Sequence, residues 1–167
     1  MNESQIPATR ESEGIPPQTR NSPPQHILVV DDDRCIRQLN TEVLLCSGYE
    51  VDAAEDGAAA WDILQLKGYD LLITDNEMPK VSGIELVKRL HAARMDLPVI
   101  MATGTPPKAE FARCPWLKPA ATLIKPYTFD ELLVAVREVL SVTDAAPGQN
   151  APRPDWRSQP SAGRLRL

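Results

Sequence analysis

Long hydrophobic runs and paired cysteines are both missing from this 167-residue sequence. No apolar run approaches the roughly 20 residues that a bilayer-spanning helix needs. Residues 1–25 contain no apolar segment of the kind found in secretory signal peptides. The three cysteines show no CxxC spacing and leave one thiol over. We therefore expect reduced, structural thiols in a cytoplasmic protein that does not insert into membranes.

Aromatic residues are also scarce, at 5%, whereas 43% of all residues are hydrophobic. The apolar content is therefore mostly aliphatic, as expected of one globular domain of about 120 residues. Five of the 16 prolines lie in residues 1–25 and four in residues 145–167, and neither segment has hydrophobic periodicity. Such segments bury too little apolar surface to offset the entropy lost on ordering. We predict a disordered N-terminal tail over 1–25, a folded domain over 26–141 and a disordered C-terminal tail over 142–167.

Acidic residues outnumber basic residues in the predicted domain. Residues 26–144 carry a net charge of −7, whereas residues 145–167 carry +3 and the whole chain −5. Nucleic acids attract proteins chiefly through phosphate contacts from Lys and Arg. An acidic body argues against nucleic acid as the main partner, so we expect no direct nucleic-acid binding.

Short apolar runs alternate with helical patterns along the predicted domain. The predicted strands span residues 26–30, 49–54, 70–74, 98–101 and 121–124. Residues that favour a helix start, such as Asp56, Ser82 and Thr128, follow the second, third and fifth runs. This alternation is typical of an α/β protein with an open parallel sheet and helices on both faces. Four prolines within residues 104–120 predict a fourth helix that is short or degenerate.

Polar side chains stand where several of these strands end. Asp31 and Asp32 follow the first strand, Asp75 follows the third, and Thr103 and Lys125 follow the fourth and fifth. In parallel sheets such side chains meet at the carboxyl edge, where ligands bind. Clustered carboxylates repel one another and call for a cation, and hard oxygen ligands suit Mg²⁺.

A lysine and a hydroxyl beside that cation would complete a receptor for a phosphoryl group, and a carboxylate can itself be the nucleophile. Each residue alone has a plainer explanation, because an Asp after a strand often only caps the next helix. We assign that role to Asp33 and leave it outside the site. The combination, with each group at the end of a different apolar strand, favours the functional interpretation.

These residues carry a family resemblance. Val29-Val-Asp-Asp32, Asp75-Asn-Glu-Met-Pro79 with Gly83 eight positions past Asp75, Thr103 and Lys125-Pro-Tyr127 form one specific set. The segment from about 26 to 141 resembles the receiver domain of bacterial response regulators in two-component signalling. The resemblance implies a flavodoxin-like receiver fold, with five parallel strands in the order 2-1-3-4-5 and five helices.

The resemblance also implies a role for each matching residue. Asp75 would accept the phosphoryl group, while Asp31, Asp32, Asp75 and the backbone carbonyl of Glu77 would hold Mg²⁺. In the same scheme Thr103 and Lys125 would bind the phosphoryl oxygens. The donor would be a sensor histidine kinase or a histidine phosphotransfer protein, and the output would be contact with a downstream protein target. Any catalysis would be self-directed phosphotransfer and autodephosphorylation, so we do not expect an enzyme.

One departure from the family pattern leaves alternatives open. The family usually places an aromatic residue three positions before the lysine, where this chain has Thr122. We expect a stand-alone receiver, since only a short tail follows the last predicted helix. A degenerate receiver that acts as a phosphorylation-independent scaffold is a second hypothesis. A Mg²⁺-dependent phosphatase is a third, because Glu77 follows Asp75, and Asp33 follows Asp31, at the spacing that such enzymes use for a general acid.

Overall fold

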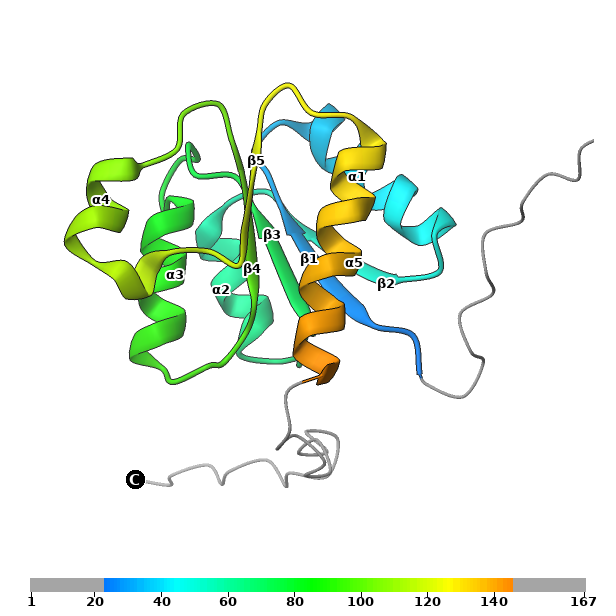
Figure 1. Ribbon diagram of the computed structural model, residues 1–167, viewed down its shortest axis with the longest axis horizontal. Coiled ribbons are helices and arrows are strands. Elements are labelled where there is room, and N and C mark those ends of the chain that lie inside the picture. The colour runs from blue at the N-terminus through cyan, green and yellow to red at the C-terminus, as the bar shows by residue number, and fades with distance from the viewer. Residues whose placement is uncertain (1–22, 146–167) are drawn as a thin grey trace, which may run out of the picture.

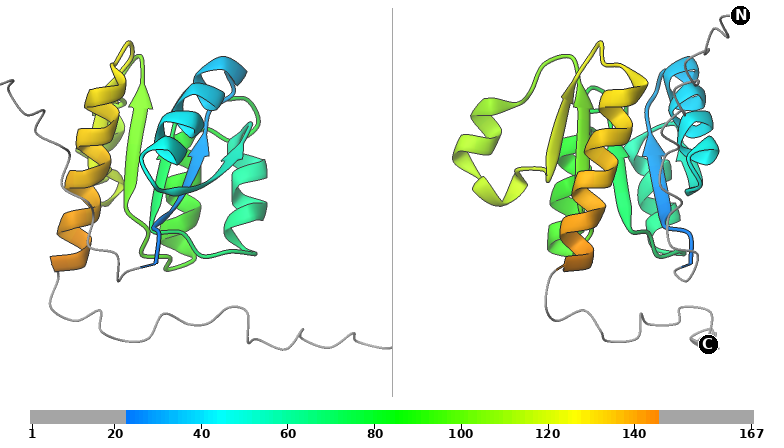
Figure 2. Two further views of the ribbon diagram at one scale, coloured as in Figure 1. Left: turned by 90° about the vertical axis from the view of Figure 1, so that its right-hand side faces the viewer. Right: turned by 45° about the vertical axis from the view of Figure 1, so that its right-hand side comes forward.

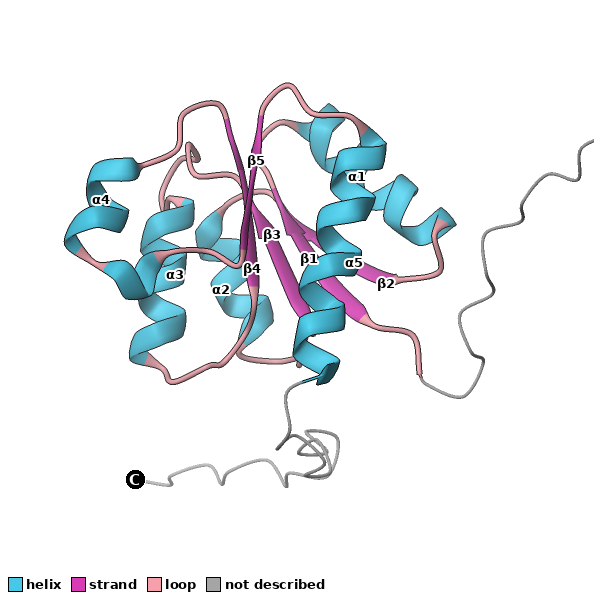
Figure 3. Ribbon diagram, in the orientation of Figure 1, coloured by secondary structure: helices cyan, strands magenta, loops and turns pink. Residues whose placement is uncertain are grey.

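Five parallel strands form one sheet in the computed structural model, which describes residues 23–145 (Figures 1 and 3). Their order is β2-β1-β3-β4-β5, as predicted. The strands are β1 (His26–Val30), β2 (Glu50–Ala54), β3 (Leu71–Thr74), β4 (Val99–Thr103) and β5 (Ala121–Ile124). Nearly all of the predicted N-terminal tail and nearly all of the predicted C-terminal tail lie outside the described residues.

Helices cover both faces of the sheet, and their bounds are α1 (Arg34–Cys46), α2 (Gly57–Leu64), α3 (Gly83–Ala92), α4 (Lys108–Arg113), the 3₁₀ helix η1 (Pro115–Leu117) and α5 (Phe129–Ala145). Figure 2 shows α1 and α5 on one face of the sheet and α2 and α3 on the other. Helix α5 continues to Ala145, past the expected boundary at residue 141. None of the helices in residues 23–145 has the length and apolar character to cross a bilayer.

The two faces of the sheet bury two separate apolar clusters. Alternate residues of β1 point to opposite sides, because successive side chains of a strand do so. Ile27 and Val29 join residues of α1 and α5, such as Leu44 and Val136. Leu28 and Val30 instead join a cluster formed with α2 and α3. A strand that is covered by helices on both faces, such as β1, therefore has a continuous apolar run in the sequence.

Side-chain caps fix where several helices begin. The carboxylate of Asp33 accepts hydrogen bonds from the N–H groups of Cys35 and Ile36, and Asp56 caps α2 in the same way. The hydroxyl of Ser82 accepts from the N–H of Glu85 at the start of α3. Such acceptors satisfy N–H groups that have no partner within the helix. These caps therefore fix the residues at which α1, α2 and α3 begin.

The fourth helix is short, as the prolines predict. Helix α4 has six residues between Pro107 and Pro115, and its N-cap makes no side-chain hydrogen bond. It runs into η1, whose Trp116 ring stacks on His91 of α3 with a centroid distance of 4.2 Å. Figure 1 shows α4 lying beyond α3, at the side of the molecule. Thr122 and Ile124 of β5 are exposed, the latter by 49% of its surface.

Candidate functional site

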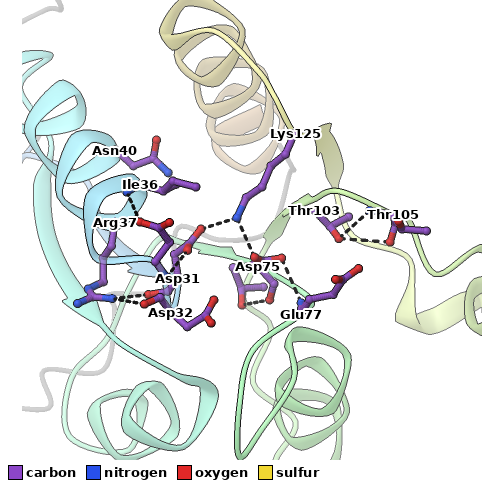
Figure 4. Close-up of polar contacts among 12 residues, drawn as sticks. Asp31, Asp32, Ile36, Arg37, Asn40, Asp75, Glu77, Thr103, Thr105 and Lys125 are labelled. Carbon is purple, nitrogen blue, oxygen red and sulfur yellow. Dashed lines mark hydrogen bonds and ion pairs between the residues drawn. The ribbon is translucent and has the colours of Figure 1, made fainter.

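The register of the sheet brings two buried carboxylates together. Val30 pairs with Thr74, so Asp31 and Asp75, the residues that follow them, lie next to each other at the carboxyl edge. Asp31 is 2% exposed and Asp75 is 8% exposed. The neighbouring Asp32 is exposed. Carboxylate oxygens of Asp31, Asp32 and Asp75 lie within 4.8 Å of one another (Figure 4).

Lys125 directly follows β5, and its side chain extends to the carboxylates of Asp31 and Asp75. Its Nζ donates to Oδ2 of Asp31 and to Oδ2 of Asp75, both at 2.7 Å. Burial opposes the charge on Lys125, but these hydrogen bonds and the two negative charges outweigh it and raise the lysine pKa. For Asp31 the balance differs, because burial raises its pKa more than Lys125 and the N–H of Asp33 lower it. The site therefore holds one firmly charged cation among partly desolvated carboxylates.

The loop between β3 and α3 wraps around Asp75. The N–H of Glu77 donates to Asp75 Oδ1 at 3.1 Å, and the N–H of Ile84 donates to the side chain of Asn76 at 3.2 Å. Gly83 lies directly against the carbonyl of Asp75, so a Cβ there would overlap the backbone. The family resemblance implies a metal-binding role for the carbonyl of Glu77. The observed contact instead comes from its N–H, and the role of the carbonyl stays a prediction.

Thr103 ends β4 on the other side of Asp75 (Figure 4). It is fully buried, and its hydroxyl exchanges hydrogen bonds with the backbone of Thr105 at 3.2 and 3.3 Å. The carbonyl of Thr103 accepts from the N–H of Lys125 at 3.0 Å, which ties the end of β4 to the segment that carries the lysine. Thr103 thus lies at the predicted sheet edge with its hydroxyl engaged in its own loop.

Helix α1 supports the acidic side of the site. Asp33 caps this helix, as expected, and its N–H donates to Asp31 Oδ1 at 2.9 Å. One turn later, Nη1 of Arg37 donates to the carbonyl of Asp31 at 2.5 Å (Figure 4). Sequence reasoning missed Arg37, because a single arginine on a helix carries no signal of its target.

Two further contacts near the site were also missed. Asn40 of α1 donates through Nδ2 to the hydroxyl of Tyr127 at 2.8 Å. Lys80 of the β3–α3 loop forms an ion pair with Asp56, at 2.5 Å, beside the N-terminus of α2. The residues of these pairs lie 87 and 24 positions apart in the sequence. A polar Asn40 within an otherwise apolar stripe of α1 was the one available signal.

The donor set fits a hard divalent cation. Oxygen ligands of one octahedral Mg²⁺ lie about 3 to 4 Å apart, given metal–oxygen distances of about 2.1 Å. The oxygens of Asp31, Asp32 and Asp75 meet that geometry with small movements. Exposed Asp32 leaves the site open to water, which Mg²⁺ usually retains as a ligand. The acidic pocket is thus compatible with Mg²⁺ and with phosphorylation of an aspartate.

Comparison with known proteins places residues 27–137 in one family, because they match the family model of the response regulator receiver domain. The response regulator MprA of Mycobacterium sp. (strain KMS) is 34% identical over 131 residues, which cover 77% of this chain and 56% of the relative. The MprA protein of Mycobacterium avium (strain 104) is 36% identical over 119 residues, or 70% and 51% of the two chains. The chain thus spans about half the length of the curated relatives it matches.

Solved structures agree with this assignment. The response regulator TrrA of Thermotoga maritima, in complex with Mg(2+)-BeF, is 34% identical with a TM-score of 0.60, covering 69% of this chain and 98% of that one. A CheY-like receiver domain protein of Methanospirillum hungatei has a TM-score of 0.68 at 26% identity, covering 73% and 98%. The sheet order, the acidic edge and these similarities agree with one another. The chain belongs to the response regulator receiver domain family of two-component signalling.

Proposed function

We propose that this chain accepts a phosphoryl group on Asp75 in a Mg²⁺-dependent reaction and signals through protein–protein contacts. The observation that carries the proposal is the meeting of Asp75, Lys125 and the Asp31–Asp32 pair at one edge of the sheet. Each group has a part in phosphoryl transfer to a carboxylate. The proposed donor is a sensor histidine kinase or a histidine phosphotransfer protein.

In the transfer step a carboxylate oxygen of Asp75 attacks phosphorus. An O–P bond forms while the P–N bond of the donor phosphohistidine breaks, and the imidazole leaves with the electron pair and takes up a proton. Asp75 is held for this attack by the N–H of Glu77 and by Lys125. We assign the metal-binding role to Asp31, Asp32, Asp75 and the carbonyl of Glu77. Bound Mg²⁺ would neutralise charge on the carboxylates and on the phosphoryl oxygens.

Lys125 and Thr103 receive the transferred group in this scheme. The Lys125 ammonium already contacts Asp75, so a short movement of its flexible stem brings it to a phosphoryl oxygen. The hydroxyl of Thr103 would exchange its contact with Thr105 for the phosphoryl group. That exchange would move the β4–α4 segment and so link chemistry at Asp75 to the surface formed by α4, β5 and α5.

The output is contact with a downstream protein target, and no turnover of an external substrate is proposed beyond self-directed phosphotransfer and autodephosphorylation. Whether the receiver acts alone stays a prediction, because the chain spans about half the length of its matched relatives. Thr122, exposed on β5, stands where the family usually has an aromatic residue. This departure favours one competing function, a scaffold that does not depend on phosphorylation. The two functions differ in whether Asp75 is chemically required.

The test is intact-mass spectrometry after incubation with acetyl phosphate and Mg²⁺. We expect a single phosphoryl adduct on the wild-type chain, none on Asp75→Asn, and none when EDTA removes the metal. Asp62→Asn, which changes an exposed carboxylate on α2, is the matched control and should keep the adduct. An adduct that persists in Asp75→Asn would overturn the site. No adduct with acetyl phosphate or with a cognate kinase would favour the scaffold.

A further inference from the structure

Helix α1 carries a buried amide among apolar side chains. Asn40 is only 3% exposed, whereas Leu44, one turn further along the same face, belongs to the core beneath α5. Burying an amide without hydrogen bonds is unfavourable, so its partner matters to the protein. That partner is the hydroxyl of Tyr127, which accepts from Asn40 Nδ2 at 2.8 Å.

Tyr127 stands two residues after Lys125, in the segment that joins β5 to α5. Its ring packs against the same apolar cluster as Leu44 and Val136. The backbone of Lys125 is therefore tied on both sides. Its own N–H donates to the carbonyl of Thr103 at 3.0 Å, and two residues later the Tyr127 hydroxyl is fixed to α1.

The same helix also holds the acidic side of the site. Arg37, one turn before Asn40, donates to the carbonyl of Asp31 (Figure 4). Helix α1 is thus joined through Arg37 to the backbone of Asp31, and through Asn40 to the segment that carries the lysine. A lysine side chain is long and flexible, so its reach depends on where its backbone is fixed.

We propose that Tyr127 and Asn40 are positioning residues, whose hydrogen bond fixes the Lys125 ammonium relative to Asp31 and Asp75. The inference rests on the proposed phosphoryl transfer to Asp75 and adds two residues that act on it without touching the phosphoryl group. Loss of the Tyr127 hydroxyl would free the β5–α5 segment to shift away from α1. Lys125 would then meet the phosphoryl group in fewer productive arrangements, while the Mg²⁺ ligands would stay in place.

The test compares beryllofluoride, a phosphoryl analogue, with Mg²⁺ alone. In Tyr127→Phe we expect the beryllofluoride complex, titrated by calorimetry at saturating Mg²⁺, to weaken about three- to tenfold, the range of one lost hydrogen bond. Mg²⁺ affinity without beryllofluoride should stay within about twofold, because none of the proposed metal ligands lies in the β5–α5 segment. Leu140→Val, a change in the same core cluster at the far end of α5, is the control for a general loss of stability.

A double variant separates positioning from packing. Asn40→Leu combined with Tyr127→Phe leaves no unpaired amide, so the melting temperature should rise above that of Tyr127→Phe. Positioning by the hydrogen bond predicts that beryllofluoride binding stays weakened in the double variant. Recovery of binding together with stability, or unchanged binding in Tyr127→Phe, would overturn the inference. A wild-type chain that binds Mg²⁺ but not beryllofluoride would instead overturn the proposed function on which it rests.

Discussion

Neighbouring carboxylates at this site differ in what they contribute to folding. Burial raises the pKa of Asp31, so the folded state holds a proton there more readily than the unfolded chain does. Its negative charge near neutral pH therefore lowers stability. Asp32 is exposed and remains solvated, so its charge costs little. The two adjacent aspartates should accordingly respond differently to substitution.

Asp32→Ala should separate metal binding from stability. We expect the free energy of unfolding to change by no more than about 0.5 kcal/mol, as for most exposed positions. Mg²⁺ affinity should fall at least about tenfold, because one of the three clustered carboxylates is lost. Urea unfolding without metal and a Mg²⁺ titration measure the two quantities. Unchanged Mg²⁺ affinity would remove Asp32 from the proposed ligand set.

Gly83→Ala should damage the site through the backbone. A Cβ at this position would overlap the carbonyl of Asp75, so either α3 or the β3–α3 loop must shift. We expect a loss of about 1 to 3 kcal/mol in the free energy of unfolding, as for other overpacking changes. Phosphorylation by acetyl phosphate should slow as well, since Asp75 itself is displaced.

Gly104→Ala is the matched control, because a Cβ there meets nothing within 4 Å although the residue adjoins Thr103. Both glycines lie near the same sheet edge, and each variant adds one methyl group. Equal stability losses in the two variants, measured by urea unfolding, would show that the close approach to Asp75 is not the cause.

Among the secondary-structure elements, the features set by local sequence were the ones that could be predicted. The capping roles of Asp33, Asp56 and Ser82 follow from side chains that bond within three residues of themselves. The short α4 follows from prolines at its two ends. Strand β4 was predicted to end at Met101, but it continues through Ala102 and the polar Thr103, both of which are buried.

Contacts between elements could not be predicted, because no local rule specifies their partners. The Asn40–Tyr127 hydrogen bond joins α1 to the β5–α5 segment, and the Lys80–Asp56 ion pair joins the β3–α3 loop to α2. Each of these two contacts forms only when the helices have packed against the sheet, and no local sequence pattern specifies that packing. The candidate site could be predicted since its residues lie at strand ends, whereas the contacts that support it could not.

The Lys80–Asp56 pair predicts a pH dependence at the start of α2. Hydrogen bonds from Lys80 and from the N–H of Ala59 hold the pKa of Asp56 below its usual value. A depressed pKa in the folded state adds stability above the unfolded value of about 4, and that stability is lost as the pH falls through the folded value. Asp56→Asn, which keeps a capping oxygen, should therefore lower the urea midpoint at about pH 7 and converge on wild type in acid.

Asp56→Ala is the comparison that separates the charge from the cap. It should cost about 1 kcal/mol more than Asp56→Asn at every pH, because the capping acceptor for Ala58 and Ala59 is lost as well. A difference between wild type and Asp56→Asn that stays constant down to about pH 2 would contradict the assigned role of the charge.

At the scale of the whole molecule, the alternation of strands and helices predicts a parallel sheet but not its order. Several strand orders satisfy right-handed crossovers, and the order 2-1-3-4-5 came from the family resemblance. The order matters because β1 and β3 become neighbours, which sets Asp31 beside Asp75 although 44 positions separate them in the sequence. The fold thus concentrates negative charge at the carboxyl edge of the sheet, where the Lys125 ammonium is the positive charge that contacts Asp31 and Asp75.

This concentration of charge predicts that Mg²⁺ stabilises the whole domain. A ligand that binds only the folded state at about 100 times its dissociation constant adds about 2.7 kcal/mol. For a domain of this size the melting temperature should then rise by about 10 °C. The rise, measured by calorimetry, should shrink in acid, because the ligand carboxylates must lose their protons to bind metal and burial raises the pKa of Asp31. Asp32→Ala should reduce the rise at equal Mg²⁺ concentration, and an equal rise in both proteins would place the cation elsewhere.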